Sequence, residues 1–405
     1  MKILFLTLID INSINERGLY QDLLREFSKN KHSLYIVSPT ERRKKKKTYL
    51  IKDAFSTILK VKTLNIQKAN LIEKGIGTFA IEHQYLSAIK KNFKDICFDL
   101  VLYSTPPITF TKVIQYIKNR DNTYSYLLLK DIFPQNAVDL GMLNKGNLLY
   151  KFFRKKEKKL YEVSDAIGCM SQANVKYIKD HNPNLDTTKI EENPNTIDPV
   201  GFNLNKKQRI SIRKKYNLPT NNRIFVYGGN LGKPQGLDFL LQTIEKNKHP
   251  NVFFLIVGNG TEYNRMNKWF IQNKPNNAKL LNSLPKGEYD LLLSSCDVGL
   301  IFLNKYFSIP NFPSRLLSYL EMKMPVIAAT DKNTDIGDII ENANCGLKVI
   351  SGNHKLMQQA IDLFANKESL EDLNNNSYKL LQEKYKVEIS YSLIINKINN
   401  NQVYV

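Results

Sequence analysis

A glycine-rich segment at residues 227–236 has the composition of an anion-binding turn. It reads Tyr-Gly-Gly-Asn-Leu-Gly-Lys-Pro-Gln-Gly and lies between an apolar run typical of a strand and a segment with helically spaced leucines. Glycines let backbone amides approach an anion closely, and Lys233 could pair with it. The spacing is neither that of a Walker motif nor Gly-x-Gly-x-x-Gly. The sequence favours an anion site here over a loop selected only for tight turning.

A second turn places an arginine where a helix is expected to begin. It reads Phe-Pro-Ser-Arg-Leu-Leu-Ser-Tyr-Leu, and its Pro313 suits the first helical position, which puts Arg315 in the first turn. A cation there opposes the helix dipole and costs a few tenths to about 1 kcal/mol unless an anion is bound. We therefore expect Arg315 to contact a phosphate. The alternative is a surface salt bridge to Glu321 or Asp297.

One carboxylate lies where the first series of strands would present it to a ligand. Asp131 follows the apolar run that begins at Tyr124. Its side chain could orient a hydroxyl group or accept its proton, or it could cap the following turn. No Asp-x-Asp pair and no cluster with metal-ligand spacing is found, so no metal is expected.

Basic clusters suggest a partner surface. The chain carries 59 Lys+Arg against 38 Asp+Glu, a net charge of +21. Arg42, Arg43 and Lys44 open one basic run, and residues 148–161 interleave basic and aromatic side chains. Such a pattern predicts contact with an anionic membrane surface, with Phe152 and Phe153 inserting at the interface. A solvated charged face is the alternative, and it is favoured for the lysine run alone.

Alternating apolar runs and amphipathic segments predict an α/β fold. Hydrophobic residues make up 42% and charged residues 24% of 405 residues, which excludes a disordered or coiled-coil chain. Short apolar runs without polar alternation are typical of parallel strands covered on both faces. Those of the first series are residues 2–9, 33–39, 99–104, 124–131 and 166–171, and those of the second are 223–229, 252–260, 297–303, 324–330 and 345–350.

Two similar domains are expected, with a boundary near residue 200, where prolines and Gly201 interrupt the chain. The predicted limits are 1–200 for the first domain and 201–380 for the second, with a helical segment at 381–405 that we expect to pack back on the first. The apolar run near the N-terminus is too short for a membrane span or a secretory signal. A cytoplasmic protein is therefore predicted.

Taken in order, these pieces resemble GT-B glycosyltransferases, specifically the retaining family 4 enzymes that assemble bacterial capsule and O-antigen repeats. The similarity lies in residues 16–27, 127–143, 157–171, 193–198, 227–241 and 312–330, of which the last two are the most specific. The resemblance implies two Rossmann-like parallel-sheet domains facing each other across a cleft. It also implies a nucleotide-sugar held mainly by the second domain and an acceptor held by the first.

Site residues follow from the same resemblance. Those expected to bind the donor are Gly18, Gly229, Asn230, Gly232, Gly258, Asn259, Asn282, Leu284, Ser314, Leu317 and Ser318. Gly229 to Gly236 would face the diphosphate, residues 258–260 and 282–284 would flank the nucleoside, and Gly18 would let its loop close over the phosphates. Many relatives carry a Glu-x7-Glu pair where this chain has Pro310 and Ser318, so Lys233 and Arg315 are expected to supply the charge that stabilises the leaving nucleotide.

The sequence thus predicts a transferase without a metal or other cofactor. It would move an N-acetylated amino or deoxyamino sugar, with retention, from a UDP-linked donor to a lipid-linked saccharide on the inner face of the membrane. Lys233, Arg315 and Asp131 are the expected catalytic residues. A nucleotide-sugar 2-epimerase shares this architecture and is the main alternative. A basic nucleic-acid-binding protein is a weaker one, because no helix-turn-helix, RNP or zinc pattern is present.

Overall fold

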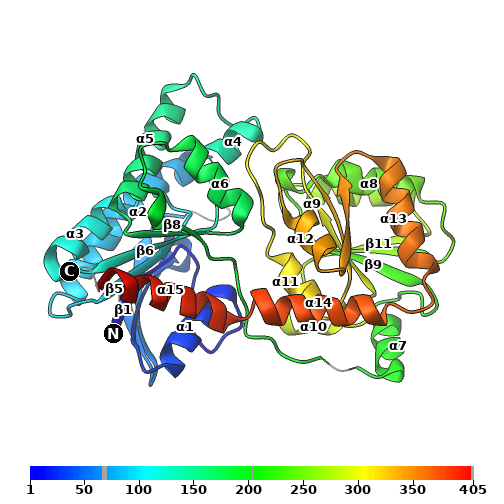
Figure 1. Ribbon diagram of the computed structural model, residues 1–405, viewed down its shortest axis with the longest axis horizontal. Coiled ribbons are helices and arrows are strands. Elements are labelled where there is room, and N and C mark those ends of the chain that lie inside the picture. Colours follow the sequence, from blue (N-terminus) through cyan, green and yellow to red (C-terminus); the bar gives the residue numbers. More distant parts are fainter. Residues whose placement is uncertain (66–70, 203, 403–405) are drawn as a thin grey trace. The chain divides into compact units, whose positions relative to one another are not determined.

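The computed structural model describes residues 1–65, 71–202 and 204–402, which form two compact units (Figure 1). Unit 1 consists of Met1–Asp198 together with the chain from Val387 onward, and unit 2 of Pro199–Lys386. Each unit is built around its own sheet. Among the described strands, every neighbouring pair is parallel except β3 and β4 in unit 1. This confirms the α/β class predicted from the apolar runs.

The sheet of unit 1 has the strand order β3-β4-β2-β1-β5-β6-β7-β8. Only β3 is antiparallel to its neighbour, β4. The strand order reverses between β1 and β5, and ligands of open α/β sheets collect beyond the carboxyl ends of the strands at such a point. The strands are β1 (Lys2–Leu6), β2 (Ser33–Glu41), β3 (Tyr49–Lys52), β4 (Ser56–Thr63), β5 (Leu100–Ser104), β6 (Tyr124–Leu129), β7 (Ala166–Cys169) and β8 (Ile190–Glu192).

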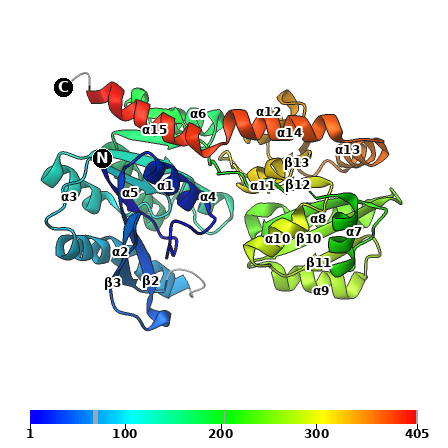
Figure 2. The same cartoon turned by 90° about the horizontal axis from the view of Figure 1, so that it is seen from below.

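Helices pack on this sheet through fully buried side chains such as Phe5, Leu24 and Phe27. The last described helix, α15, packs against α1 (Figure 2). The ring centroids of Tyr391 and Phe27 lie 5.0 Å apart at this contact. The helices of unit 1 are α1 (Leu19–Lys29), α2 (Leu71–Asn92), α3 (Thr111–Asp121), α4 (Gln135–Asp139), α5 (Leu148–Val163), α6 (Gln172–His181) and α15 (Val387–Gln402), with short 3-10 turns η1 (Arg42–Lys44) and η2 (Thr187–Lys189).

Unit 2 has a six-stranded parallel sheet of order β11-β10-β9-β12-β13-β14. Counted from β9, this is the order 3-2-1-4-5-6 of dinucleotide-binding folds, and its reversal lies between β9 and β12. The register sets Gly229 beside Gly258 and Asn230 beside Asn259. The strands are β9 (Arg223–Asn230), β10 (Val252–Asn259), β11 (Ala278–Leu281), β12 (Val298–Phe302), β13 (Val326–Thr330) and β14 (Gly346–Ile350).

The helices of unit 2 cover both faces of this sheet. Leu237, Leu240 and Ile244 on α8 are buried, as their spacing predicted. The helices are α7 (Lys206–Lys215), α8 (Leu237–Lys246), α9 (Tyr263–Asn273), α10 (Lys286–Leu293), α11 (Arg315–Glu321), α12 (Ile336–Asn342), α13 (His354–Asn366) and α14 (Glu371–Lys384), with the 3-10 turn η3 (Lys233–Gln235). Within the described part of the chain, no helix is long and apolar enough to cross a bilayer.

Candidate active site

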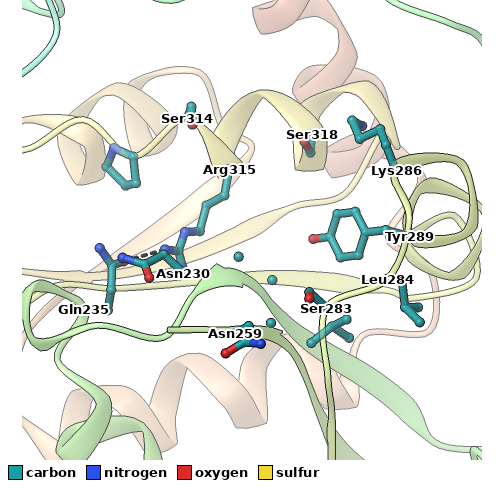
Figure 3. A pocket seen from close by; sticks show the side chains of 15 residues that line it. Asn230, Gln235, Asn259, Ser283, Leu284, Lys286, Tyr289, Ser314, Arg315 and Ser318 are labelled. Atoms are coloured by element: carbon teal, nitrogen blue, oxygen red, sulfur yellow. Dashed lines mark hydrogen bonds between the residues drawn. The ribbon is translucent and has the colours of Figure 1, made fainter. Parts of the chain in front are cut away.

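A pocket of about 610 Å³ opens at the carboxyl edge of the sheet of unit 2 (Figure 3). Its floor is formed by the ends of β9 and β10, which lie next to the reversal of strand order. Its walls come from the residues that precede and begin α10 and from the start of α11. All of these residues belong to unit 2.

Glycine is required at the floor because the two strands end in close contact. A Cβ atom on Gly258 would lie 1.9 Å from the carbonyl oxygen of Gly229, and one on Gly228 would lie 1.8 Å from the hydroxyl oxygen of Tyr289. Gly229 adopts φ of +119°, a conformation that side chains disfavour. The backbone of both turns therefore lies close to any ligand in the pocket.

Arg315 is the principal cation of the pocket. Its side chain reaches from α11 toward Gln235, where its Nη2 atom donates a hydrogen bond to Oε1 (Figure 3). The guanidinium carbon lies 4.2 Å from the centroid of the Tyr227 ring, a cation–π contact. The Nη1 atom is buried and has no hydrogen-bond partner among the described residues. A buried donor on a charged group is costly to leave unpaired, so the site is suited to an anion.

Neither carboxylate considered for Arg315 pairs with it. Glu321 accepts a hydrogen bond of 2.7 Å from the backbone of Val200, and Asp297 pairs with Arg209 and Arg213 at 2.7 Å each. The salt-bridge alternative is therefore wrong. Helix α11 begins at Arg315 itself and spans seven residues. The unpaired guanidinium nitrogen therefore indicates an anion site, whereas the dipole of so short a helix does not.

Seven of the residues expected to bind the donor line the pocket, and so do Arg315, an expected catalytic residue, and Gln235, part of the turn expected to face the diphosphate. Tyr289 lines it as well, although the sequence patterns did not assign it a role there. Gln235 lies within the glycine-rich turn itself. Tyr289 is brought in by long-range packing against Gly228, for which no local signal exists. The seven expected donor residues are Gly229, Asn230, Gly258, Asn259, Leu284, Ser314 and Ser318.

Other expected donor residues lie elsewhere in unit 2. Leu317 is 1% exposed in the core and does not line the pocket, because one position of helical rotation separates it from Ser318. Gly232 is buried, and Lys233 is exposed in η3, two residues before the pocket-lining Gln235. Asn282 lies beside the pocket, where its Oδ1 atom accepts a hydrogen bond of 3.0 Å from Asn259.

In unit 1, Asp131 follows β6 at the carboxyl edge of the sheet. Its carboxylate accepts a hydrogen bond of 2.7 Å from Asn136, and α4 is preceded by Pro134, so Asp131 is not the cap of that helix. Burial raises the pKa of Asp131 to about 6, and the bond from Asn136 opposes this shift. Burial also lowers the pKa of the adjacent Lys130 to about 7. Gly18 lies in the same unit and precedes α1.

The structure exposes some of the residues expected at a membrane and buries one of them. Phe152 is 39% exposed, but Phe153 is 8% exposed and packs against Phe133 with ring centroids 5.0 Å apart. The prediction that Phe153 inserts at a membrane interface is therefore wrong, because its ring is part of the core. Arg42, Arg43 and Lys44 are exposed in η1. Two of them have acidic partners: Arg43 pairs with Glu41, and Lys44 with Asp10.

No group of three His, Cys, Asp or Glu side chains that could hold a metal ion is found among the described residues. The polar groups of the pocket are amides, hydroxyls, one lysine and one arginine. Such a set suits an anion and offers little to a divalent cation, which prefers carboxylate oxygens.

Comparisons with known proteins agree with this geometry. Residues 208–380, which include the whole pocket, match the family model of glycosyl transferases group 1. The chain is 22% identical over 329 residues to the probable glycosyltransferase WbjE of Pseudomonas aeruginosa, covering 80% of this chain and 79% of that protein. It is 20% identical over 279 residues to the putative colanic acid biosynthesis glycosyl transferase WcaI of Escherichia coli, covering 66% and 65% of the two chains.

Solved structures are similar over nearly the whole chain. The structure of Anabaena HepE in complex with UDP gives a TM-score of 0.67 at 13% identity and covers 99% of this chain and 100% of that one. A structure from E. coli bound with UDP-2-fluoro glucose gives a TM-score of 0.73 at 11% identity, covering 98% and 99%. These likenesses show the fold, which is that of GT-B glycosyltransferases. The family match in unit 2 and the named glycosyltransferase relatives support a transferase enzyme.

Proposed function

We propose that this transferase uses a nucleotide diphosphate sugar, UDP-linked, whose diphosphate lies against Arg315. The observation that supports it is Arg315, which lines a pocket floored by glycine backbone and whose buried Nη1 atom has no partner within the described part of the chain. A diphosphate oxygen would satisfy this donor with a charge-assisted hydrogen bond. The similar HepE structure was determined in complex with UDP, which is consistent with the proposal.

In this arrangement the nucleoside extends along the pocket toward Leu284 and Asn259, and Ser314 borders the phosphates (Figure 3). Negative charge grows on the departing phosphate oxygen as the sugar leaves. Arg315 would stabilise that charge most strongly because the guanidinium is largely removed from water. Lys233 is an exposed second cation of the same turn, and we assign it an auxiliary role.

We assign the acceptor to the carboxyl edge of unit 1, where Asp131 would orient the attacking hydroxyl group. A carboxylate with a pKa of about 6 is ionised near neutral pH and can accept that hydrogen bond. Transfer with retention requires the acceptor oxygen to bond to the anomeric carbon on the face from which the phosphate leaves, while the leaving phosphate oxygen takes the acceptor proton. No protein nucleophile is needed in this route.

The proposed acceptor is a lipid-linked saccharide of bacterial surface polysaccharide synthesis, and the proposed sugar is N-acetylated amino or deoxyamino. The name of the relative WcaI refers to colanic acid biosynthesis, which supports this class. A lipid-linked acceptor requires contact with the inner face of the membrane. The exposed side chains suited to it are Met142, Leu148, Leu149 and Phe152, which precede or begin α5.

Charge favours the same surface. A hollow of about 440 Å³ along α5 is lined by Lys151, Arg154, Lys155, Lys158 and Lys159, together with Tyr150 and Glu162. Each Lys or Arg near an anionic leaflet contributes about 1 kcal/mol to binding. The exposed apolar residues at the start of α5 would insert, and these basic residues would contact headgroups.

A thermal-shift screen of nucleotide-sugars tests the proposed donor. A donor present at about 100 times its Kd should stabilise the fold by roughly 2.7 kcal/mol. Incubation of the stabilising donor with a lipid-linked saccharide should then release UDP and extend the saccharide, and NMR of the product would report the anomeric configuration. If no nucleotide diphosphate shifts the melting temperature, the proposed donor site is wrong.

A further inference from the structure

The pocket has no acidic side chain with which to hold a sugar diol. Among the residues that line it in the described part of the chain, none is Asp or Glu. Two acids of the neighbouring helices are engaged elsewhere: Asp290 pairs with Lys286, and Glu321 accepts from the backbone of Val200. The hydroxyl groups that line the pocket are those of Ser283, Tyr289, Ser314 and Ser318.

A ribose bound to an α/β sheet is commonly recognised through its hydroxyls by a carboxylate. In dinucleotide-binding folds an Asp or Glu accepts a hydrogen bond from the ribose 2′-hydroxyl. Such a bond to a charged acceptor is worth about 1.5–3 kcal/mol, or roughly 10- to 150-fold in affinity, whereas a neutral pair contributes about 0.5–1.5 kcal/mol. Recognition of the 2′-hydroxyl therefore depends on whether a carboxylate is present.

Ser318 supplies one of these hydroxyls from the helix that carries Arg315. It lies three residues after Arg315 on α11, so the two side chains lie on the same face of the helix, and both line the pocket. Tyr289 projects its hydroxyl group into the pocket on the side of Ser318 (Figure 3). With the diphosphate at Arg315, the ribose would lie between these two hydroxyls and Leu284.

We propose that this pocket does not discriminate ribose from 2′-deoxyribose, so its donors include 2′-deoxynucleoside diphosphate sugars as well as ribonucleoside ones. The inference rests on the proposed nucleotide site and specifies its substrate class. A ligand without the 2′-hydroxyl leaves no carboxylate unpaired here, since the neighbouring hydroxyls can rotate toward water or toward one another. Rejection of the deoxynucleotide therefore has no physical basis in this pocket.

Titration calorimetry with UDP and dUDP on the full chain tests the inference, because the two ligands differ only in the 2′-hydroxyl. We expect their Kd values to differ by less than about tenfold, the range of a neutral hydrogen bond. A tenfold or greater preference for UDP would overturn the inference while leaving the proposed nucleotide site intact. Failure of both nucleotides to bind would overturn the proposed function and this inference together.

A second variant tests the assignment of Ser318. Ser318→Glu restores an acidic acceptor beside Arg315, and we expect it to raise the preference for UDP over dUDP above about tenfold. If the variant binds UDP with the same UDP-to-dUDP ratio as the unaltered protein, Ser318 does not face the ribose and the assignment is overturned. If the glutamate side chain prevents folding, Ser318→Asp provides a carboxylate acceptor on a shorter side chain. The comparison of UDP with dUDP on the unaltered chain needs no variant.

Discussion

Replacing Arg315 with alanine should weaken UDP binding without unfolding the protein. The Nη1 atom of Arg315 is buried without a partner in the part of the chain that the structure describes, and Nη2 donates to Gln235, so at least one charge-assisted bond is available to a phosphate. One such bond contributes about 1.5–3 kcal/mol. We therefore expect Arg315→Ala to raise the Kd of UDP by roughly 10- to 150-fold. The loss in kcat/KM should be at least as large, because charge on the phosphate grows in the transition state.

The fold should tolerate this change. Arg315 has no acidic partner among the residues that the structure describes, so its removal leaves no buried carboxylate behind. The lost cation–π contact with Tyr227 is offset by relief of an incompletely compensated charge. The free energy of unfolding without ligand should change by no more than about 1 kcal/mol. Arg315→Lys keeps the charge but loses the planar fork, and it should fall between the two proteins in UDP affinity.

Calorimetry with UDP and a UDP-release assay measure these effects. Arg223→Ala is the matched control, because Arg223 begins β9 at the end of the strand opposite the pocket, and its UDP affinity should stay within about twofold of the unaltered protein. If folded Arg315→Ala also binds UDP within twofold of the unaltered protein, the reasoning from the unpaired guanidinium is refuted.

Three further changes separate the parts of the proposal. Lys233→Ala should lower kcat/KM by less than about tenfold, since its ammonium is exposed to water, and a loss equal to that of Arg315→Ala would restore Lys233 to the principal role. Because Asp131 has a pKa of about 6 and acts when ionised, kcat/KM should fall as the pH drops through 6. Asp131→Asn should lower activity and abolish this fall in kcat/KM at acidic pH. The same fall in the variant would assign the pH dependence to another group. Leu148→Asp combined with Leu149→Asp should weaken sedimentation with anionic vesicles at least tenfold. Leu363→Asp, on the exposed face of α13, should leave sedimentation unchanged. Equal binding by both variants would exclude the α5 surface as the membrane contact.

The sequence predicted the central strands well because parallel strands covered on both faces are continuous apolar runs. It missed β4, which contains Lys60. That lysine is 1% exposed, and its ammonium is held by Asp10, by the carbonyl oxygen of Ile11 at 2.9 Å and by Ser38 at 3.0 Å. A lysine buried by partners distant in the sequence cannot be distinguished from a surface lysine without the fold.

Site residues could be predicted where a glycine-rich or strand-to-helix turn is visible in the sequence. They could not be predicted where the rotation of a helix or long-range packing determines which side chain faces the site. Arg315 and the paired glycine turns follow from strand-to-helix context. Leu317 and Phe153 each lie next to an accessible residue in their helices, and one position of helical rotation places both in the core. Tyr289 enters the pocket only because Gly228 leaves room for its ring.

A crystal structure of the full chain with UDP would show whether the diphosphate binds at Arg315. We expect the diphosphate at the carboxyl ends of β9 and β10, with a phosphate oxygen about 2.7–3.2 Å from the Nη1 atom of Arg315. UDP bound elsewhere, or bound in this pocket with Nη1 still unpartnered, would contradict it.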